Sequence, residues 1–455
     1  MAVCAVTFGV MATKYEKVGG VVDYAEATCG KTYAYFIGWF MAMIYYPAMT
    51  SVLGWLSARY TLEFLVSVVP GFKLMIPAEA GGCVFGPECI ALSLFYLCAC
   101  YGINVLSPKL GGKLQISTTI IKFIPLTLMA VVGVILGVTS GTLTENFTTP
   151  AQLPDTGANP LFASVCATAF AYEGWIIATS INAEIKDSKK NLPKALVIGG
   201  FVIIATYTLY YIGVAGGASN QELIAGGTTV AFTNIFGTVL GNILKLFVAI
   251  SCIGTMNGLM MASCRSFYSI AARRQGPAPD VLAQVDKRTN VTNNSAALSL
   301  IIIGAWFAYF YLANLAGTWT GPFVFDSSEL PIITIYLMYL PIFIQWMRKE
   351  KSENALRRFV LPTLAFIGSV FMVIACIIGH GIGCLWYLIV FTLVMLLGSF
   401  LSDFAVQELI CAGSVMIVAL GLNLLKVTKI KVANLLPGLV FVPFVCMIFD
   451  LISKG

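Results

Sequence analysis

Charged residues are scarce in this 455-residue chain: Asp, Glu, Lys and Arg make up only 11% of it, whereas 58% is hydrophobic. Because a soluble domain carries about a quarter charged residues, the composition excludes an ordinary soluble protein. Apolar runs of about 20 residues recur along the chain, and each can cross the hydrocarbon core of a bilayer as a helix. Transmembrane β-barrels show alternating segments of ~10 residues instead. We therefore expect an all-α, polytopic membrane protein.

Residues with catalytic potential are also scarce. The only histidine of the sequence, His380, falls in a Gly-rich connection, where a lone histidine is usually inert. The spacing of the other polar residues shows no Ser-His-Asp set, phosphate-binding loop or metal cluster. An enzyme is thus the least expected class, and no cofactor is implied. The net charge of +6 does not indicate nucleic-acid binding, because Lys and Arg of membrane proteins concentrate in cytoplasmic loops.

Most of the 13 cysteines lie inside apolar runs, where cysteine behaves as a small hydrophobic residue. Cys83 and Cys89 are different, because they share one loop. They could form a disulfide if that loop faces an oxidising space, although spacing alone is a weak signal. Both the bonded and the free state are open on the sequence.

Apolar runs between charged or Gly/Pro breaks define the candidate membrane spans. The run 233–263 is longer than a bilayer requires, which predicts that it tilts or extends beyond the membrane. The other runs lie at 33–57, 84–106, 115–138, 161–183, 195–215, 294–315, 327–347, 359–379, 384–402, 405–425 and 433–452. Met1–Ala12 is apolar but too short to span, and it has no basic leader of a signal peptide. We interpret this segment as the C-terminal half of a helix whose beginning is missing.

Lys and Arg are distributed unevenly between the two sets of alternating loops. Nineteen of the 27 lie in one set, and this set is therefore predicted to be cytoplasmic. Its loops are 13–32, 107–113, 184–194, 264–293 and 348–358. Lys426, Lys429 and Lys431 break the alternation, which suggests either a looser rule for late loops or a different origin for the tail.

A stretch with the sequence AFAYEGW, at 169–175, places Glu173 and Gly174 in the middle of a predicted span. Glycine weakens a helix by about 1 kcal/mol relative to alanine, and irregular backbone is tolerated in a membrane only against protein or a water-filled cavity. One interpretation is a broken helix of the kind secondary transporters use for binding. The alternative is a continuous helix in which Glu173 pairs with a neighbour.

Three more polar residues fall within spans. Lys122 is expected either to take part in the function of the protein or to extend its ammonium to water at the cytoplasmic interface. The sequence favours neither interpretation. Lys245 lies nearer the outer interface, so we expect its side chain to reach water there. Asn257 is expected to hydrogen-bond between packed helices, although a cavity-lining role is open.

The stretch 170–196 resembles the sixth helix and following loop of amino acid–polyamine–organocation permeases. That family shows an aromatic-small-Tyr-x-Gly-aromatic break, an acidic residue and a basic loop ending in N-x-P-[KR]-A. The corresponding residues here are Phe170–Trp175, Glu184 and Asn191–Ala195, with Asp187-Ser188 replacing the usual Asn-Pro. The stretches 17–39, 114–125 and 257–279 resemble other parts of the family in the same order. The resemblance covers roughly residues 1–400.

The resemblance implies an inverted five-helix repeat, a LeuT-like bundle, in the cell membrane. It implies secondary active transport of amino acids by alternating access, as proton-coupled symport or exchange; the alternative is a polyamine or organic cation substrate held by Glu173. The implied substrate-binding residues are Phe170, Ala171, Tyr172, Glu173 and Gly174. Phe170 would also gate the outer side, and Glu173 would tune cation preference or serve packing.

Lys122 matches the lysine that this resemblance places where related symporters hold sodium. Its ammonium can replace the ion as a fixed charge or exchange protons.

Two features depart from the family. Its first helix, which carries the partner break, has no counterpart, so we expect a bundle truncated at the N-terminus and weigh a non-transporting remnant as an alternative. Residues 401–455 resemble the C-terminus of an uncharacterised bacterial membrane protein family. We therefore expect a permease core at 1–400 and a two-helix tail at 401–455.

Overall fold

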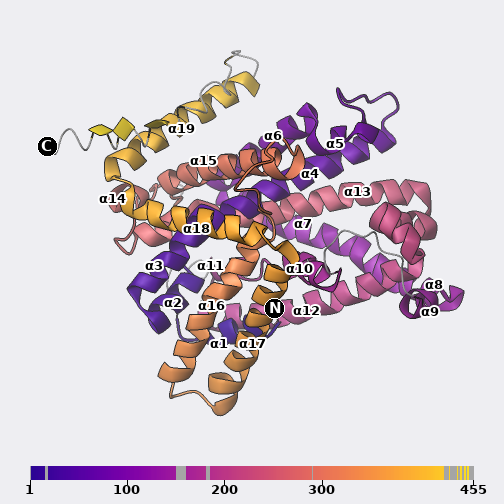
Figure 1. Ribbon diagram of the computed structural model, residues 1–455, viewed down its shortest axis with the longest axis horizontal. Coiled ribbons are helices and arrows are strands. Elements are labelled where there is room, and N and C mark those ends of the chain that lie inside the picture. The colour runs from indigo at the N-terminus through magenta and orange to yellow at the C-terminus, as the bar shows by residue number, and fades with distance from the viewer. Residues whose placement is uncertain are drawn as a thin grey trace.

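The computed structural model describes residues 2–15, 19–149, 160–180, 185–288 and 290–424, with eight single positions between 430 and 449. All regular structure in this part of the chain is helical (Figure 1). The N-terminal helix α1 (Ala2–Ala12) lies inside the bundle, and α19 projects from one end of it. The expectation of an all-α polytopic protein is confirmed.

The first half of the chain contains α2 (Val21–Cys29), α3 (Lys31–Phe40), the π-helical η1 (Met41–Tyr45), α4 (Tyr46–Val68), the 3₁₀ turn η2 (Ala78–Ala80), α5 (Gly82–Phe85), α6 (Pro87–Leu106), α7 (Pro108–Leu128), the π-helical η3 (Met129–Gly133), α8 (Val134–Ser140), α9 (Thr142–Thr148), α10 (Pro160–Tyr172) and α11 (Ile177–Ser180). The second half contains α12 (Ser188–Gly217), α13 (Asn220–Ala271), α14 (Pro279–Leu282), α15 (Asn293–Tyr309), η5 (Phe310–Leu315), α16 (Leu330–Lys349), η6 (Leu356–Val360), α17 (Leu361–His380), α18 (Gly383–Phe400) and α19 (Asp403–Leu424).

Nine helical segments of the described residues are long and apolar enough to cross a membrane, and they match the first nine predicted spans. Several helices begin earlier than their apolar runs: α7 starts at Pro108 and α12 at Ser188. The difference arises because hydropathy marks only the apolar part of a helix, and the first turns of α7 and α12 are polar. Of the last three predicted spans, 384–402 and 405–425 form a helix pair bent by 110°, and 433–452 lies mostly outside the described residues.

The long span predicted at 233–263 belongs to α13, which has 52 residues. Two kinks divide it, at Gly227 with φ 63° and at Gly237 with φ 83°. Residues with a side chain rarely adopt these torsions, so glycine is required at both kinks. The segment therefore extends beyond one bilayer crossing, as its length predicted.

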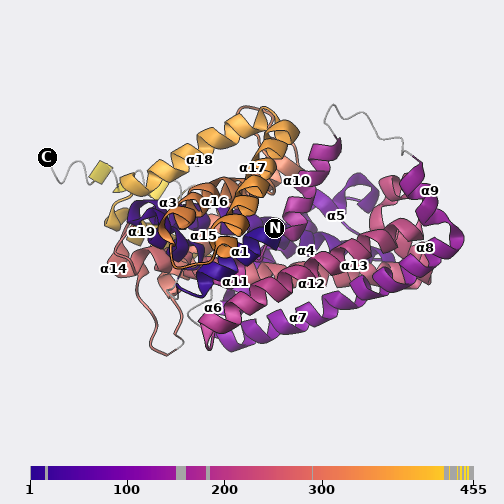
Figure 2. The ribbon, with the colours of Figure 1, turned by 90° about the horizontal axis from the view of Figure 1, so that it is seen from below.

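One span occupies the centre of the bundle. The segment Lys31–Val68, formed by α3, η1 and α4, has 94% of its apolar window buried inside the protein, against 11% for Ser188–Gly217. Figure 2 accordingly shows α4 within the bundle and α7 and α12 along one edge. The central helix is thus the element against which the other spans pack.

Glycines permit a close approach between η3–α8 and α12. A Cβ added at Gly133 would overlap the carbonyl of Gly213, and a Cβ at Gly137 would overlap the backbone of Gly216. Helix pairs in membranes gain van der Waals contact in this way, because lipid supplies little hydrophobic drive for association. This contact fixes the outer ends of the two helices against each other.

Asn257 connects α13 to α6 and α7. Its side chain is fully buried and accepts a hydrogen bond from Asn104 at 2.9 Å. It also donates to the carbonyl of Gly111 at 3.0 Å and to Gln115 at 3.1 Å. The structure therefore supports the interhelical packing role expected for this residue.

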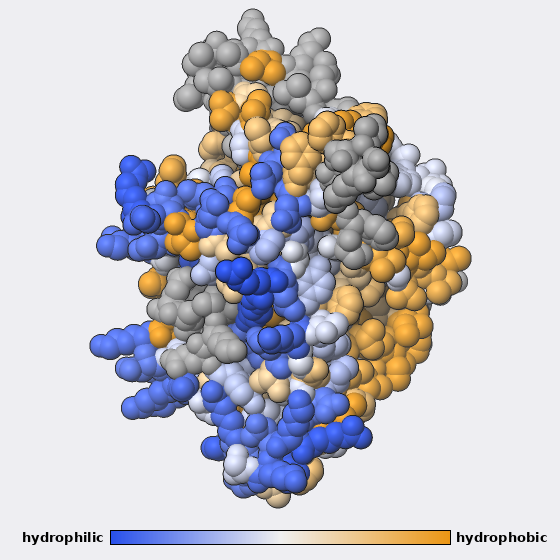
Figure 3. Space-filling view, turned by 90° about the vertical axis from the view of Figure 1, so that its left-hand side faces the viewer, coloured by the Kyte–Doolittle hydropathy of each residue, from blue (hydrophilic) through white to orange (hydrophobic). Residues whose placement is uncertain are grey.

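Hydrophilic residues gather on the side of the molecule that carries α2, α3 and α14 (Figure 3). On this side Arg273 forms ion pairs with Asp23 and Glu26, which ties the end of α13 to α2. Lys14 donates to Glu350 at 2.6 Å, and this bond holds the pKa of the Glu350 carboxyl below its usual range. These pairs belong to the loops predicted to be cytoplasmic.

The tail helix α19 packs against α15. At its start the carboxylate of Asp403 accepts a hydrogen bond from the Ala278 backbone at 2.5 Å. Residues 403–424 are thus joined to the cytoplasmic side of the bundle. The tail lysines at 426, 429 and 431 lie outside the described residues.

Candidate functional site

The helix that carries AFAYEGW is interrupted within that stretch. α10 ends at Tyr172, residues 173–176 are not helical, and α11 begins at Ile177. Gly174 has φ 103°, a conformation that residues with a Cβ rarely adopt. A Cβ there would meet only Ile177 Cδ1, at 3.8 Å, so torsion rather than crowding requires glycine. The predicted broken helix is confirmed, and the alternative of a continuous helix is wrong.

Glu173 occupies the break, and two tyrosines from other helices hold it. Tyr45 in η1 donates to Oε1 at 2.8 Å, and Tyr336 in α16 donates to Oε2 at 3.4 Å. Each carboxylate oxygen therefore has a partner in a region where an unpaired charge costs several kcal/mol. Glu173 nevertheless keeps part of its surface exposed. It is therefore a half-buried residue with a hydrogen-bond partner on each carboxylate oxygen.

An aromatic cluster surrounds Trp175, which lies within the break. The ring of Trp175 lies 5.6 Å from Phe8 and 6.1 Å from Tyr339, and Phe8 also packs 5.4 Å from Phe343. The hydroxyl of Tyr339 is buried and has no hydrogen-bond partner among the described residues. Helices α1 and α16 thus meet the break through aromatic rings, with one buried hydroxyl free to bond.

The residues before the break differ in exposure. Ala171 is exposed, and Phe170 and Tyr172 are half-buried. Phe170 packs against the main hydrophobic core, and the Tyr172 ring lies 5.3 Å from Tyr207 in α12. The last carbonyl groups of a helix have no partner within it. The carbonyl of Phe170 accepts a hydrogen bond from the Glu173 backbone at 3.4 Å, so the carbonyls of Ala171 and Tyr172 are the candidate acceptors at the end of α10.

Lys122 lies in α7 on the side facing α13. One turn earlier, Thr118 packs against Gly254 of α13, and Cys252 lies within electrostatic range of the ammonium. No hydrogen bond or ion pair joins Lys122 to another described residue, and none links it to the break. Because α7 begins at Pro108, Lys122 is about 21 Å along the helix, but only about 10 Å from the start of the apolar run at residue 115. Function and extension of the side chain to the interface therefore both stay predictions for this residue.

The sequence reasoning missed Tyr45, Tyr336 and Tyr339 as site residues. Hydropathy treats tyrosine as part of an apolar run, so these spans looked purely structural. One signal was available: Tyr336 and Tyr339 are three apart and therefore lie on one helix face. Their partner Glu173 could not be found from spacing, because it is 163 residues from Tyr336.

Other predictions have mixed outcomes. Cys83 and Cys89 are both buried and free, so the loop disulfide that we considered does not form.

Lys245 donates to Ser67 at 2.6 Å, in the last turn of α4, which fits the expected position near the outer interface. Glu184, the acidic residue of the family motif, lies outside the described residues.

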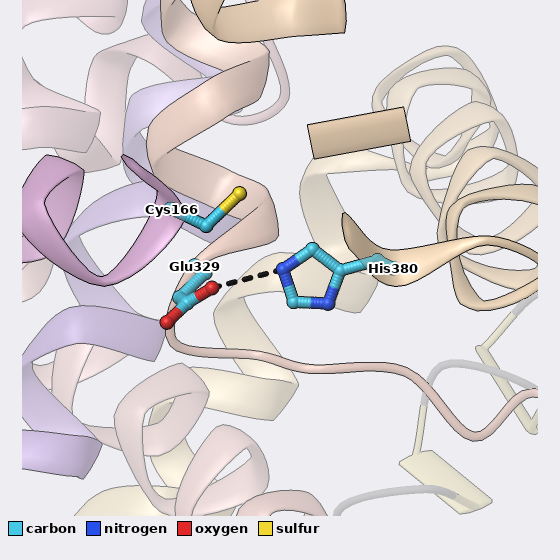
Figure 4. A group of neighbouring side chains, drawn as sticks. All are labelled: Cys166, Glu329 and His380. Carbon is cyan, nitrogen blue, oxygen red and sulfur yellow. Dashed lines mark hydrogen bonds and ion pairs between the residues drawn. The ribbon is translucent and has the colours of Figure 1, made fainter. Parts of the chain in front are cut away.

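The sequence indicated an isolated His380, and this is wrong; the expected absence of a metal site stays a prediction. His380 Nε2 lies 2.9 Å from Glu329 Oε2, and Cys166 lies beside the pair (Figure 4). The side chains come from the end of α17, the start of α16 and the middle of α10. Because three helices contribute one residue each, no local spacing could have revealed this group.

Comparison with known proteins gives two family matches. Residues 1–400 match the model of the family described as amino acid permease. Residues 360–447 match a family described as a protein of unknown function, DUF554. The second match agrees with the resemblance seen in the tail, but it begins within the segment that the first match also covers.

Several curated proteins are similar to the chain. The serine/threonine exchanger SteT of Bacillus subtilis is 26% identical over 83% of this chain and 80% of its own length. The large neutral amino acids transporter small subunit 2 of Rattus norvegicus is 27% identical over 62% of this chain. The human cystine/glutamate transporter is 25% identical over the same share.

The chain spans only about half the length of these two mammalian relatives, 51% and 54% respectively. The permease match nevertheless covers most of the chain, including the interrupted helix and every predicted site residue. The chain therefore belongs to the amino acid permease family, as a multi-pass protein of the cell membrane with a role in amino acid transport.

Proposed function

We propose that the chain exchanges amino acids by alternating access and binds them at the break between α10 and α11. One observation carries the proposal: a membrane helix is interrupted at residues 173–176, with the carboxylate of Glu173 held by Tyr45 and Tyr336. Interrupted helices near the middle of the membrane are where secondary transporters bind substrate. Exchange is favoured because the relative whose length is 80% covered is named an exchanger.

The end of α10 suits the ammonium group of an amino acid. The carbonyls of Phe170, Ala171 and Tyr172 belong to the last turn of the helix, which has a negative dipole end. Carbonyls freed by a helix break hold cations in transporters, and those of Ala171 and Tyr172 are the stronger candidates, because that of Phe170 accepts a hydrogen bond from the Glu173 backbone. Gly174 sets the torsion that ends the helix, and Phe170 would cover the site from the outer side. Lys122, in α7, would supply the coupling charge.

Uptake into proteoliposomes tests the substrate class. Purified chain is reconstituted with internal serine, and uptake of labelled serine is competed with each of the twenty amino acids and with putrescine. We expect neutral amino acids to compete. Competition by cationic amines alone would favour the polyamine alternative, in which Glu173 binds the substrate charge, and no uptake at all would favour the non-transporting alternative.

Replacing Phe170 with alanine is expected to weaken gating. The ring is half-buried at the end of α10, and its removal would leave the binding site open to the outer side. We expect the KM for uptake to rise by about tenfold, equivalent to about 1.4 kcal/mol. Steady-state uptake measures this, with Phe36→Ala as a control because Phe36 is an exposed aromatic outside the site. An unchanged KM and turnover would count against the gate.

Replacing Glu173 with glutamine separates the two substrate readings. The amide oxygen can still accept from Tyr45, but the negative charge is lost. If Glu173 only tunes preference, we expect neutral amino acid uptake to persist within about threefold, less than 1 kcal/mol. If Glu173 binds a cationic substrate, uptake of that substrate should disappear. Tyr336→Phe, which keeps the charge and removes one hydrogen bond, is the matched control.

The division of the chain into a core at 1–400 and a tail at 401–455 is part of the proposal. It is supported by the end of the permease match at residue 400 and by the 110° bend between α18 and α19. The DUF554 match starts earlier, at residue 360. Genomic reads that cross codons 398–404 without a gap would rule out an assembly error as the origin of the tail.

A further inference from the structure

A group of three potential metal ligands lies at one end of the bundle, apart from the break. The sulfur of Cys166, a carboxylate oxygen of Glu329 and a ring nitrogen of His380 all lie within 4.8 Å of one another. Figure 4 shows the three side chains converging from separate helices. Cys166 is buried, while Glu329 and His380 retain about a fifth of their side-chain surface. The three potential ligands are therefore already close together, and two of them are accessible to solvent.

The supporting contacts hold two of the ligands in place. The Asp326 carboxylate accepts hydrogen bonds from the backbone and hydroxyl of Ser328 and from the Glu329 backbone, all at 2.7 Å. This network fixes the start of α16 and with it Glu329. On the other side, a Cβ added at Gly379 would lie 3.4 Å from the Cys166 sulfur. The last turn of α17 is thus packed directly on the thiol.

The donor set points to one class of ion. Thiolate, imidazole and carboxylate together suit Zn²⁺, whereas Mg²⁺ and Ca²⁺ prefer oxygen ligands alone. A tetrahedral zinc ion holds such donors roughly 3.3–3.6 Å apart, given bonds of about 2.0–2.3 Å. The nitrogen and oxygen are 2.9 Å apart and joined by a hydrogen bond, and the sulfur lies within 4.8 Å of both. A bound ion would therefore replace this hydrogen bond and draw the three atoms to the separations of a tetrahedral site. A water molecule would supply the fourth ligand from the exposed side.

The position of the group connects it to the moving parts of a transporter. Glu329 and His380 flank α16 and α17 at the ends opposite the cytoplasmic 348–358 loop, so the group lies on the outer side. Cys166 belongs to α10, about 10 Å along the helix from Glu173. An ion bound by all three would tie the outer half of the broken helix to α16 and α17.

We propose that Cys166, Glu329 and His380 form an outward-facing Zn²⁺ site that arrests transport by fixing α10 against its neighbours. The arrest rests on the proposed function, because alternating access requires one helical bundle to move against the other. The binding of zinc to the three residues does not depend on the proposed function. Zinc from the outer side would enter the partly exposed pair Glu329–His380 first and then displace the proton of the Cys166 thiol.

Metal binding to the purified full chain in detergent tests the site. We use Co²⁺ as a probe, since a thiolate ligand gives it a charge-transfer absorption band, and then displace it with Zn²⁺. We expect one ion per chain, with loss of the band in Cys166→Ser and a Kd increase of more than tenfold in His380→Gln. Cys98→Ser is the control, because Cys98 is a half-buried thiol outside the group. An unchanged band and Kd in both ligand variants would overturn the site.

Uptake with and without external Zn²⁺ tests the arrest. We expect zinc to reduce wild-type uptake at least fivefold, a chelator to restore it, and His380→Gln to be insensitive. Binding without inhibition would overturn the arrest. A cobalt band in a chain that transports no amino acid would contradict the proposed function and leave the metal site standing. The two proposals therefore fail in distinguishable ways.

Discussion

Substitution of Lys122 by alanine is expected to abolish coupled transport while the protein still folds. Lys122 lies deep in α7, is half-buried and makes no ion pair with any described residue. A lysine inside a membrane is costly unless it serves function or reaches water. We expect uptake to fall by more than about tenfold, for which a loss of 1.4 kcal/mol suffices. Uptake as a function of pH, with folding checked by size-exclusion chromatography, measures the effect.

The matched control for this substitution is Lys245→Ala. Lys245 is also within a membrane span, but its ammonium donates to Ser67 near the outer end of α4. Removing it should leave the rate and the pH dependence of uptake nearly unchanged. Wild-type uptake with an unchanged pH profile in Lys122→Ala would rule out the coupling role. It would then indicate that the lysine serves packing between α7 and α13.

Substitution of Gly20 by alanine is expected to destabilise the protein by about 3 kcal/mol or more. Gly20 precedes α2 with φ 56° and ψ −112°, and this torsion alone costs a residue with a side chain about 1–3 kcal/mol. A Cβ at Gly20 would also lie 2.6 Å from the carbonyl carbon and oxygen of Thr179. Those atoms are backbone, so α11 would have to move, which adds the cost of overpacking, about 1–3 kcal/mol.

Gly30→Ala separates torsional strain from steric overlap as causes of the expected loss of stability. Gly30 has φ 99°, and no atom lies within 4 Å of a Cβ placed there, so only torsional strain is added. We expect a smaller loss of thermal stability in detergent and retained uptake, whereas Gly20→Ala should lose both. Equal losses in the two variants would show that contact with Thr179 does not matter. The comparison therefore tests whether the inner half of the broken helix is positioned by the loop before α2.

Several parts of the site were predictable because they depend on short stretches of chain. The helix end at Tyr172 follows from Gly174, whose torsion no other residue adopts easily, and from the small residues around it. Ala171, which is exposed, lies beside the same break. The nine apolar spans follow from residue hydropathy alone, although polar turns extend α7 and α12 beyond their runs.

The side-chain partners of the site were not predictable in the same way. Glu173 and Tyr45 are 128 residues apart, and both lie in runs whose pattern fits many packings. His380 looked inert because its neighbours in the sequence are Gly and apolar residues. Its actual neighbours, Cys166 and Glu329, come from helices that meet only after the bundle is assembled.

The sequence by itself determined that this protein crosses a membrane many times and which loops carry the positive charge, and it marked the stretch in which one helix breaks. These properties are local: the free energy of burying a run of residues and the torsions open to glycine depend little on the rest of the chain. Only the tertiary structure decided which side chains pair with Glu173, what faces Lys122, and that three ligands converge at His380. Such contacts depend on helix packing, which apolar surfaces in lipid leave largely unspecified until particular small and polar residues fit together.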